Sequence, residues 1–224
     1  MRRFTLEAVD WLLAQDVKLL VLACNTATAR ALDLVRARSS VPVVGVVRPG
    51  AVAAASATRS GSVAVIATAG TVESGAYPAA IEEAAGSTHV AQLACPELVP
   101  MVEAGILDGR RAETVLRAYL EPLLAATPGI DTLLLGCTHY PLLRPVIEGI
   151  VGKGVAVVDS AFTTALAVED LLDALGARAS GEPAGHRVAT TGEVDAFVSV
   201  ASRLFGERLP AVEEARIEPA GAIP

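Results

Sequence analysis

The chain has 224 residues, of which 52% are hydrophobic and 19% charged, and its formal net charge is −7. This composition is typical of a globular protein with a sizeable core, and the acidic balance argues against a general nucleic-acid surface. No apolar run reaches the roughly 18 residues that cross a bilayer, and Glu7 and Asp10 interrupt the stretch that a signal peptide needs apolar, so we expect a cytoplasmic protein that binds no membrane and no nucleic acid.

Apolar residues alternate along the chain between helical spacing and continuous strand-like runs. The opening helix, expected at residues 4–13, has no Ser, Thr, Asp or Asn before its first turn. Strands are expected at residues 17–23, 41–47, 62–67, 89–95, 131–135, 155–158 and 187–191. Further helices are expected at residues 27–38, 77–85, 97–105, 112–124, 140–150, 163–175 and 194–205. Strands that alternate with helices predict an α/β fold, with parallel sheets covered by helices on both faces.

Turn-forming residues separate several of these elements. Pro49 and Gly50 predict a break in the chain, and residues 68–71 and 180–185 are expected to form loops. The last residues, rich in Pro, Glu and Ala, are expected to be poorly ordered.

The chain also contains an internal repeat. The order strand, cysteine, helix, strand over residues 17–47 returns over residues 131–158, and it places Cys24 and Cys137 in equivalent positions. Two related halves would bring the loops after these strands to a shared cleft. The second half has two further strands before its cysteine, so the repeat predicts that about 50 residues are missing from the front of the first half.

The cysteines carry the clearest chemical signal. Three widely spaced cysteines without a CxxC pair favour free thiols over a disulfide or a zinc site. Cys24 and Cys137 each end a strand and precede short polar residues, where backbone N–H groups and a helix dipole can lower a thiol pKa and anchor a carboxylate. Two matched thiols predict proton abstraction beside a carboxylate, with a thiolate base on one face of a carbon and a thiol acid on the other. A lone cysteine is more often a core residue, and Cys95 is expected in the core or a loop.

Other polar residues leave two interpretations open. His139, two residues after Cys137, is a candidate to tune that thiol or to move a proton, and it is equally compatible with a capping or packed histidine. Thr68 and Thr71 either close a turn or supply hydroxyl groups at the edge of the sheet that carries Cys137. Glu103 alone is typical of a solvated helix carboxylate.

Two segments resemble the signatures of glutamate racemases, in the cofactor-independent aspartate/glutamate racemase family. They are residues 23–27, Ala-Cys-Asn-Thr-Ala, and residues 136–143, Gly-Cys-Thr-His-Tyr-Pro-Leu-Leu. The second separates glutamate racemases from aspartate racemases, which usually carry an acidic residue after Cys-Thr. Weaker matches lie at residues 66–71, 95–103 and 159–161, so that the resemblance covers nearly the whole chain.

The resemblance implies that the protein interconverts L- and D-glutamate for peptidoglycan synthesis, without pyridoxal phosphate or a metal. Cys24 would take the proton from D-glutamate and Cys137 the proton from L-glutamate, and His139 and Glu103 would assist as catalytic groups. The substrate-binding residues that it implies are Asn25, Thr26, Thr68, Thr71, Thr138 and His139. It also implies a possible homodimer.

The fold implied is a pair of flavodoxin-like parallel-sheet halves related by a pseudo-twofold axis. The first domain would comprise residues 1–47 and 159–205, the second residues 48–158, and residues 206–224 would form a tail. Members of the family open with Asp-Ser-Gly and Pro-Tyr-Gly stretches that this sequence does not contain. A second hypothesis is therefore a truncated, catalytically impaired remnant that only binds its ligand, and a third is a racemase for aspartate or a related acid.

Overall fold

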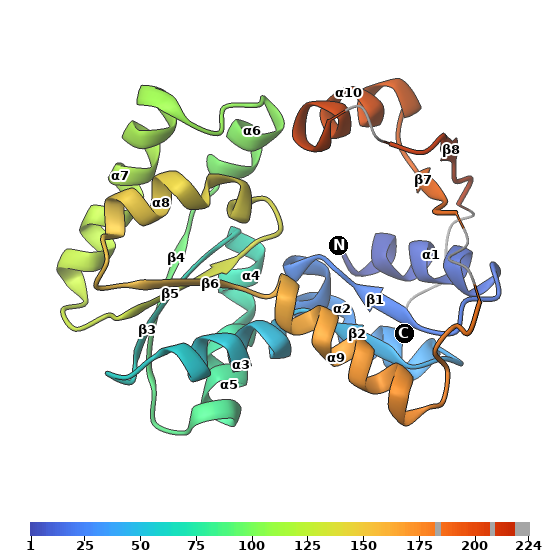
Figure 1. Cartoon of the computed structure of the whole chain (residues 1–224), viewed down its shortest axis with the longest axis horizontal. Helices are drawn as coiled ribbons and strands as arrows, with labels where there is room; N and C mark the ends of the chain where they lie inside the picture. Colours follow the sequence, from blue (N-terminus) through green and yellow to red (C-terminus); the bar gives the residue numbers. More distant parts are fainter. Residues whose placement is uncertain (182–184, 207–208, 218–224) are drawn as a thin grey trace.

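The computed structural model describes residues 1–181, 185–206 and 209–217. Within these residues the strands form three parallel sheets, with two, four and two strands (Figure 1). The four-stranded sheet has the order β4-β3-β5-β6, and the others pair β1 with β2 and β7 with β8. The strands are β1 Leu20–Leu22, β2 Val43–Gly45, β3 Ser62–Ala67, β4 His89–Ala94, β5 Thr132–Gly136, β6 Ala156–Asp159, β7 Val188–Thr190 and β8 Val212–Glu214. The α/β class with parallel sheets is confirmed.

Helices connect every pair of consecutive strands in the described residues, as parallel pairing requires. They are α1 Arg2–Leu13, α2 Asn25–Arg38, α3 Val47–Ala57, α4 Ala69–Ser74, α5 Ala76–Ala85, α6 Leu98–Glu103, α7 Gly109–Ala126, the 3₁₀ helix η1 Tyr140–Leu143, α8 Arg144–Val151, α9 Ala161–Ala174 and α10 Val194–Phe205. The start of α1 has no side-chain cap, as predicted. In the part of the chain that the structure describes, none of the helices is both long enough and apolar enough to cross a membrane.

The four-stranded sheet is buried on both faces. Ala64 and Ile66 of β3 pack into a cluster with α6, α7 and α8, whereas Val63 and Val65 pack with α3 and α5 on the opposite face. Figure 1 shows these two groups of helices on opposite sides of the sheet. Because successive strand residues point to opposite faces, a continuous apolar run such as β3 fills both layers. The prediction that helices cover both faces is confirmed for this sheet.

The sheet of β1 and β2 is shorter than expected and covered unevenly. Leu20 and Leu22 are buried against α1 and α2, whereas Val21 between them remains 40% exposed. The two strands pair in parallel from Leu20 with Val43 to Leu22 with Gly45. The expected strands at residues 17–23 and 41–47 are therefore too long, and coverage of both faces does not extend to Val21 of β1.

Two expected breaks and the expected C-terminal tail need correction. Pro49 and Gly50 lie inside α3, because Pro49 falls in the first helical turn, where a missing N–H removes no intrahelical bond. The expected loop at residues 68–71 is largely helical, since the Thr68 hydroxyl accepts a hydrogen bond from Thr71 N and caps α4. The C-terminal segment includes β8, a strand that the sequence analysis missed. Residues 182–184 of the expected loop and residues 218–224 of the expected tail lie outside the described residues.

Candidate active site

Cys24 and Cys137 lie at the carboxyl ends of two parallel strands. Cys24 follows β1 and occupies the N-cap position of α2, with an extended backbone that turns the chain into the helix. Cys137 follows β5 directly and precedes η1. Both are free thiols, Cys24 exposed and Cys137 only 7% exposed. Both cysteines therefore occupy the strand ends that the repeat predicts, and Cys95 is a buried core residue.

The two cysteines lie close enough for a charge on the sulfur of Cys24 to raise the pKa of Cys137. Burial raises the pKa of Cys137 above its ordinary value, and the charge of a Cys24 thiolate and of the Glu103 carboxylate raises it further. Backbone N–H groups in the turn after Cys137 act in the opposite direction, but burial outweighs them. The turn after Cys137 thus has the expected lowering effect on the thiol pKa, but deep burial of the sulfur makes the net shift upward. In the free protein this residue is a thiol at neutral pH.

A chain of polar contacts leads from Cys137 to the end of α6. Sγ of Cys137 lies 3.8 Å from Nδ1 of His139, and Nε2 of His139 lies 3.1 Å from Oε1 of Glu103. The Thr138 hydroxyl lies 3.5 Å from the same Nδ1. On sequence alone, His139 and Glu103 are compatible with structural or chemical roles, and the structure brings His139 to Cys137 and Glu103 to His139. An arrangement of thiol, imidazole and carboxylate can relay a proton.

Three threonine hydroxyls join the two halves of the chain. Oγ1 of Thr26, at the start of α2, lies 2.8 Å from Oγ1 of Thr68 and 3.0 Å from Oγ1 of Thr71, and the last two are 3.1 Å apart. Thr71 is fully buried, so its hydroxyl supports the other two. Thr26 and Thr68 are the members of the group that are accessible enough to meet a ligand.

Asn25 makes the contact that sequence analysis did not anticipate. Its side chain is only 2% exposed, and its Oδ1 accepts a hydrogen bond of 2.5 Å from the hydroxyl of Tyr77 in α5. Its Nδ2 is buried and has no hydrogen-bond partner among the described residues. The sequence pattern predicts only that Tyr77 begins a helix. The available signal was a tyrosine placed among alanines on the buried side of that helix.

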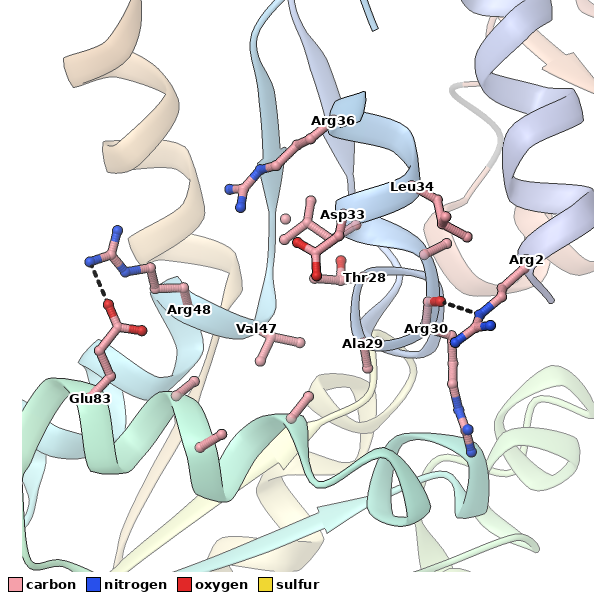
Figure 2. A pocket seen from close by; sticks show the side chains of 16 residues that line it. Arg2, Thr28, Ala29, Arg30, Asp33, Leu34, Arg36, Val47, Arg48 and Glu83 are labelled. Atoms are coloured by element: carbon pink, nitrogen blue, oxygen red, sulfur yellow. Dashed lines mark hydrogen bonds and ion pairs between the residues drawn. The ribbon is translucent and has the colours of Figure 1, made fainter. Parts of the chain in front are cut away.

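A separate cavity of about 580 Å³ lies between α2, α3 and α5 (Figure 2). Its lining includes Arg2, Asp33 and Arg48 and neither Cys24 nor Cys137. Figure 2 shows two of its arginines already engaged, Arg48 with Glu83 at 2.9 Å and Arg2 with the Arg30 carbonyl at 3.0 Å. This cavity holds no proton-transfer pair, and we place the candidate active site at the two cysteines instead. The described residues contain no group of three or more His, Cys, Asp or Glu side chains placed to hold a metal ion.

Comparison with known proteins identifies the family. Residues 2–169 match the family model described as Asp/Glu/Hydantoin racemase. The chain belongs to this family. A glutamate racemase from Oceanobacillus iheyensis is 43% identical to this racemase-family chain over 208 residues, which are 92% of this chain and 75% of the relative.

Solved glutamate racemases share the fold of this member of the Asp/Glu/Hydantoin racemase family. The enzyme from Bacillus anthracis superposes with a TM-score of 0.88 at 36% identity, over 97% of this chain and 80% of that one. The enzyme from Francisella tularensis, solved in complex with D-glutamate, superposes with a TM-score of 0.86 at 27% identity, over 96% of this chain and 80% of that one. The resemblance inferred from the two cysteine segments is confirmed.

Proposed function

We propose that this racemase interconverts L- and D-glutamate by proton transfer between two thiols. The observation that carries the proposal is the placement of Cys24 and Cys137 at equivalent strand ends, close enough for a charge on Cys24 to raise the pKa of Cys137. The similarity to glutamate racemases over about nine tenths of the chain supports glutamate as the substrate. D-glutamate made in this way serves peptidoglycan synthesis.

In the proposed reaction, one cysteine removes the Cα proton of glutamate and the other returns a proton to the opposite face. From D-glutamate, the Cys24 thiolate takes the proton, and the electron pair left on Cα is delocalised into the adjacent carboxylate. The Cys137 thiol then protonates Cα and becomes the thiolate, and the product is L-glutamate. The reverse direction exchanges the two roles. The raised pKa of Cys137 suits it to the acid role, because it enters the reaction with its proton.

The residues around the thiols take supporting roles in this proposal. His139 and Glu103 assist Cys137 in gaining and losing its proton, which their contacts of 3.8 Å and 3.1 Å support. The substrate-binding residues are Asn25, Thr26, Thr68, Thr71, Thr138 and His139, of which the buried Thr71 acts by orienting the hydroxyls of Thr26 and Thr68. Hydroxyl and amide donors suit a dicarboxylate substrate, because each can hydrogen bond to a carboxylate oxygen.

The proposal includes a domain division, an assembly and a location. Residues 1–47 with 159–205 form the first domain, residues 48–158 the second, and residues 206–224 a tail. The placement of β3 to β6 in one sheet, apart from β1 and β2, supports this division. The protein is a cytoplasmic homodimer. Light scattering coupled to gel filtration tests the assembly, and a mass near 22.9 kDa, that of one chain, would contradict it.

Circular dichroism of purified protein with D-glutamate tests the activity. The expected result is a decay of the signal to zero as the racemate forms, with D-aspartate turned over far more slowly. Faster turnover of aspartate would favour the third hypothesis. Binding of D-glutamate in a calorimeter with no change in circular dichroism would favour the ligand-binding remnant.

A further inference from the structure

Tyr77 links the two halves of the chain beside the candidate active site. It belongs to α5, which packs against the four-stranded sheet, whereas its hydrogen-bond partner Asn25 begins α2 next to β1. Its side chain is fully buried, and its hydroxyl donates to Oδ1 of Asn25 at 2.5 Å. Asn25 directly follows Cys24, so the contact lies one residue from a proposed catalytic thiol.

The nitrogen of the Asn25 side-chain amide, Nδ2, is buried and makes no hydrogen bond to the described residues. Buried donors without a partner are rare in folded proteins because they lose their bonds to water and gain none in return. This donor belongs to the residue that follows Cys24, and it is free to pair with an acceptor that enters the site.

The surroundings of Tyr77 hold its ring in one place. A methyl group added to Gly136 would lie 2.9 Å from Cε2 of Tyr77, and one added to Gly50 would lie 3.1 Å from its hydroxyl oxygen. Gly136 directly precedes Cys137, and Asn25 directly follows Cys24. The side chain of Tyr77 therefore contacts the chain next to both cysteines. Burial, then the charges of Cys137 and Asp159, raise the pKa of Tyr77, and the hydroxyl therefore keeps its proton and remains a donor.

We propose that Tyr77 is a positioning residue that sets the orientation of the Asn25 amide for the substrate. By occupying Oδ1, the tyrosine hydroxyl leaves Nδ2 to face a carboxylate of the amino acid. Without this bond the amide is free to rotate by half a turn, and Oδ1 would then oppose a negatively charged oxygen. The inference rests on the proposed function, since it names the residue that prepares that site.

Tyr77→Phe removes the hydroxyl and keeps the ring. We expect KM for both enantiomers of glutamate to rise about tenfold, with kcat changed less than about threefold, because ground-state binding is lost. Tyr140→Phe is the matched control, since Tyr140 is equally buried and its hydroxyl donates to the Cys95 carbonyl at 2.9 Å. Its KM should stay at the wild-type value. An unchanged KM in Tyr77→Phe would overturn the inference.

Two further variants separate positioning from a general structural role. In an Asn25→Ala background, Tyr77→Phe should cause no additional rise in KM, because the two residues act as a unit. Asn25→Asp keeps an acceptor for Tyr77 and replaces the free donor by an oxygen, so KM should rise at least as much as in Tyr77→Phe. An equal rise in KM on Tyr77→Phe in the wild-type and Asn25→Ala backgrounds would contradict the proposal.

A readout independent of turnover distinguishes this inference from the proposed function. In ¹H–¹⁵N spectra, the Asn25 side-chain amide gives a pair of signals that Asn25→Ala removes. Tyr77→Phe should shift or broaden this pair, and Tyr140→Phe should leave it in place. If the wild-type chain does not racemise glutamate, the proposed function fails. The Asn25 amide signals still test whether Tyr77 positions that amide. A pair that is unchanged in Tyr77→Phe would overturn the positioning role.

Discussion

Glu103 holds the ring of His139 from the side opposite Cys137. Oε1 of Glu103 lies 3.1 Å from Nε2, and Sγ of Cys137 lies 3.8 Å from Nδ1. A carboxylate beside Nε2 favours the tautomer with its hydrogen there, which leaves Nδ1 as an acceptor facing the thiol. Arg203 of α10 donates to the Glu103 carbonyl at 2.7 Å and anchors this end of α6. The geometry thus orients His139 toward the Cys137 proton.

The Glu103 carboxylate should influence the titration of Cys137. Its charge is one cause of the raised thiol pKa, so Glu103→Gln should lower that pKa and shift the pH profile of alkylation toward lower pH. Iodoacetamide labelling of the Cys137 peptide, followed by mass spectrometry from pH 6 to 10, measures the profile. In the wild type the midpoint should lie above the ordinary thiol value of about 8.5.

Glu97→Gln is the control for this experiment. Glu97 stands at the start of α6, and its carboxylate pairs with the Tyr119 hydroxyl at 3.1 Å. The pH profile of Cys137 alkylation in Glu97→Gln should match that of the wild type. A midpoint that stays in place or rises in Glu103→Gln would refute the electrostatic role of the carboxylate.

Each of the two thiols should be essential. Replacing either by serine removes a group able to exchange the Cα proton near neutral pH, so kcat/KM should fall at least about 100-fold in both directions. Circular dichroism with D- and L-glutamate measures the loss in Cys24→Ser and Cys137→Ser. Cys95→Ala is the matched control and should keep activity, since the Cys95 side chain is fully buried and its thiol contacts the Leu93 carbonyl. Retained activity in either serine variant would exclude the two-thiol reaction.

Cys95 should make folding sensitive to alkaline pH. Burial raises its pKa to about 12. The unfolded thiol loses its proton near pH 8.5, whereas the folded thiol keeps it, so the stabilisation is complete below about 8.5 and declines as pH rises toward 12. Urea unfolding at pH 7 to 10.5 should therefore show a steeper loss of stability in the wild type than in Cys95→Ala. Parallel pH slopes would argue against this linkage.

Asp131 should stabilise the turn between α3 and β3. Burial alone would raise its pKa, but hydrogen bonds from the Thr58 hydroxyl and from the backbone N–H groups of Arg59 and Ser60 lower it well below the ordinary value. A lowered pKa gives stability that is present above about pH 3.9 and lost as pH falls further. Asp131→Asn should cost about 1 kcal/mol at pH 7, because water partly replaces the lost bonds.

The control for Asp131 is Asp108→Asn, an exposed carboxylate at the start of α7 that makes no side-chain capping bond. Chemical unfolding at pH 7 and at pH 3 compares the two. The loss of unfolding free energy in Asp131→Asn should be smaller at pH 3 than at pH 7. Asp108→Asn should show neither a loss at pH 7 nor a change in that loss with pH. A deficit equal at both pH values would contradict the assignment.

Local sequence patterns predicted most of the elements. Strand β3 and helix α10 begin and end where periodicity placed them, since each is an uninterrupted pattern of its own type. The break predicted at Pro49 is wrong because the effect of a proline depends on its position within a helix, and that position depends on where α3 begins. Strand β8 was missed because a three-residue strand is defined by its partner β7 rather than by its own sequence.

The motifs and the internal repeat were enough to predict where the two catalytic candidates lie. Cys24 and Cys137 could be paired from sequence because the same local pattern surrounds both. The role of Tyr77 could not be predicted, because it depends on a contact with Asn25 across the two halves of the chain. The raised pKa of Cys137 likewise follows from tertiary burial, which overrides the local effect of backbone N–H groups.

Racemisation of D-glutamate in D₂O tests the two-thiol reaction most directly. A base on each face predicts that the L-glutamate formed early carries deuterium at Cα, while the remaining D-glutamate keeps its hydrogen, because each cysteine exchanges with solvent only when it is free of substrate. Mass spectrometry or proton NMR of the separated enantiomers measures both. Deuterium appearing in the remaining D-glutamate as fast as in the product would indicate a single base and would contradict the account.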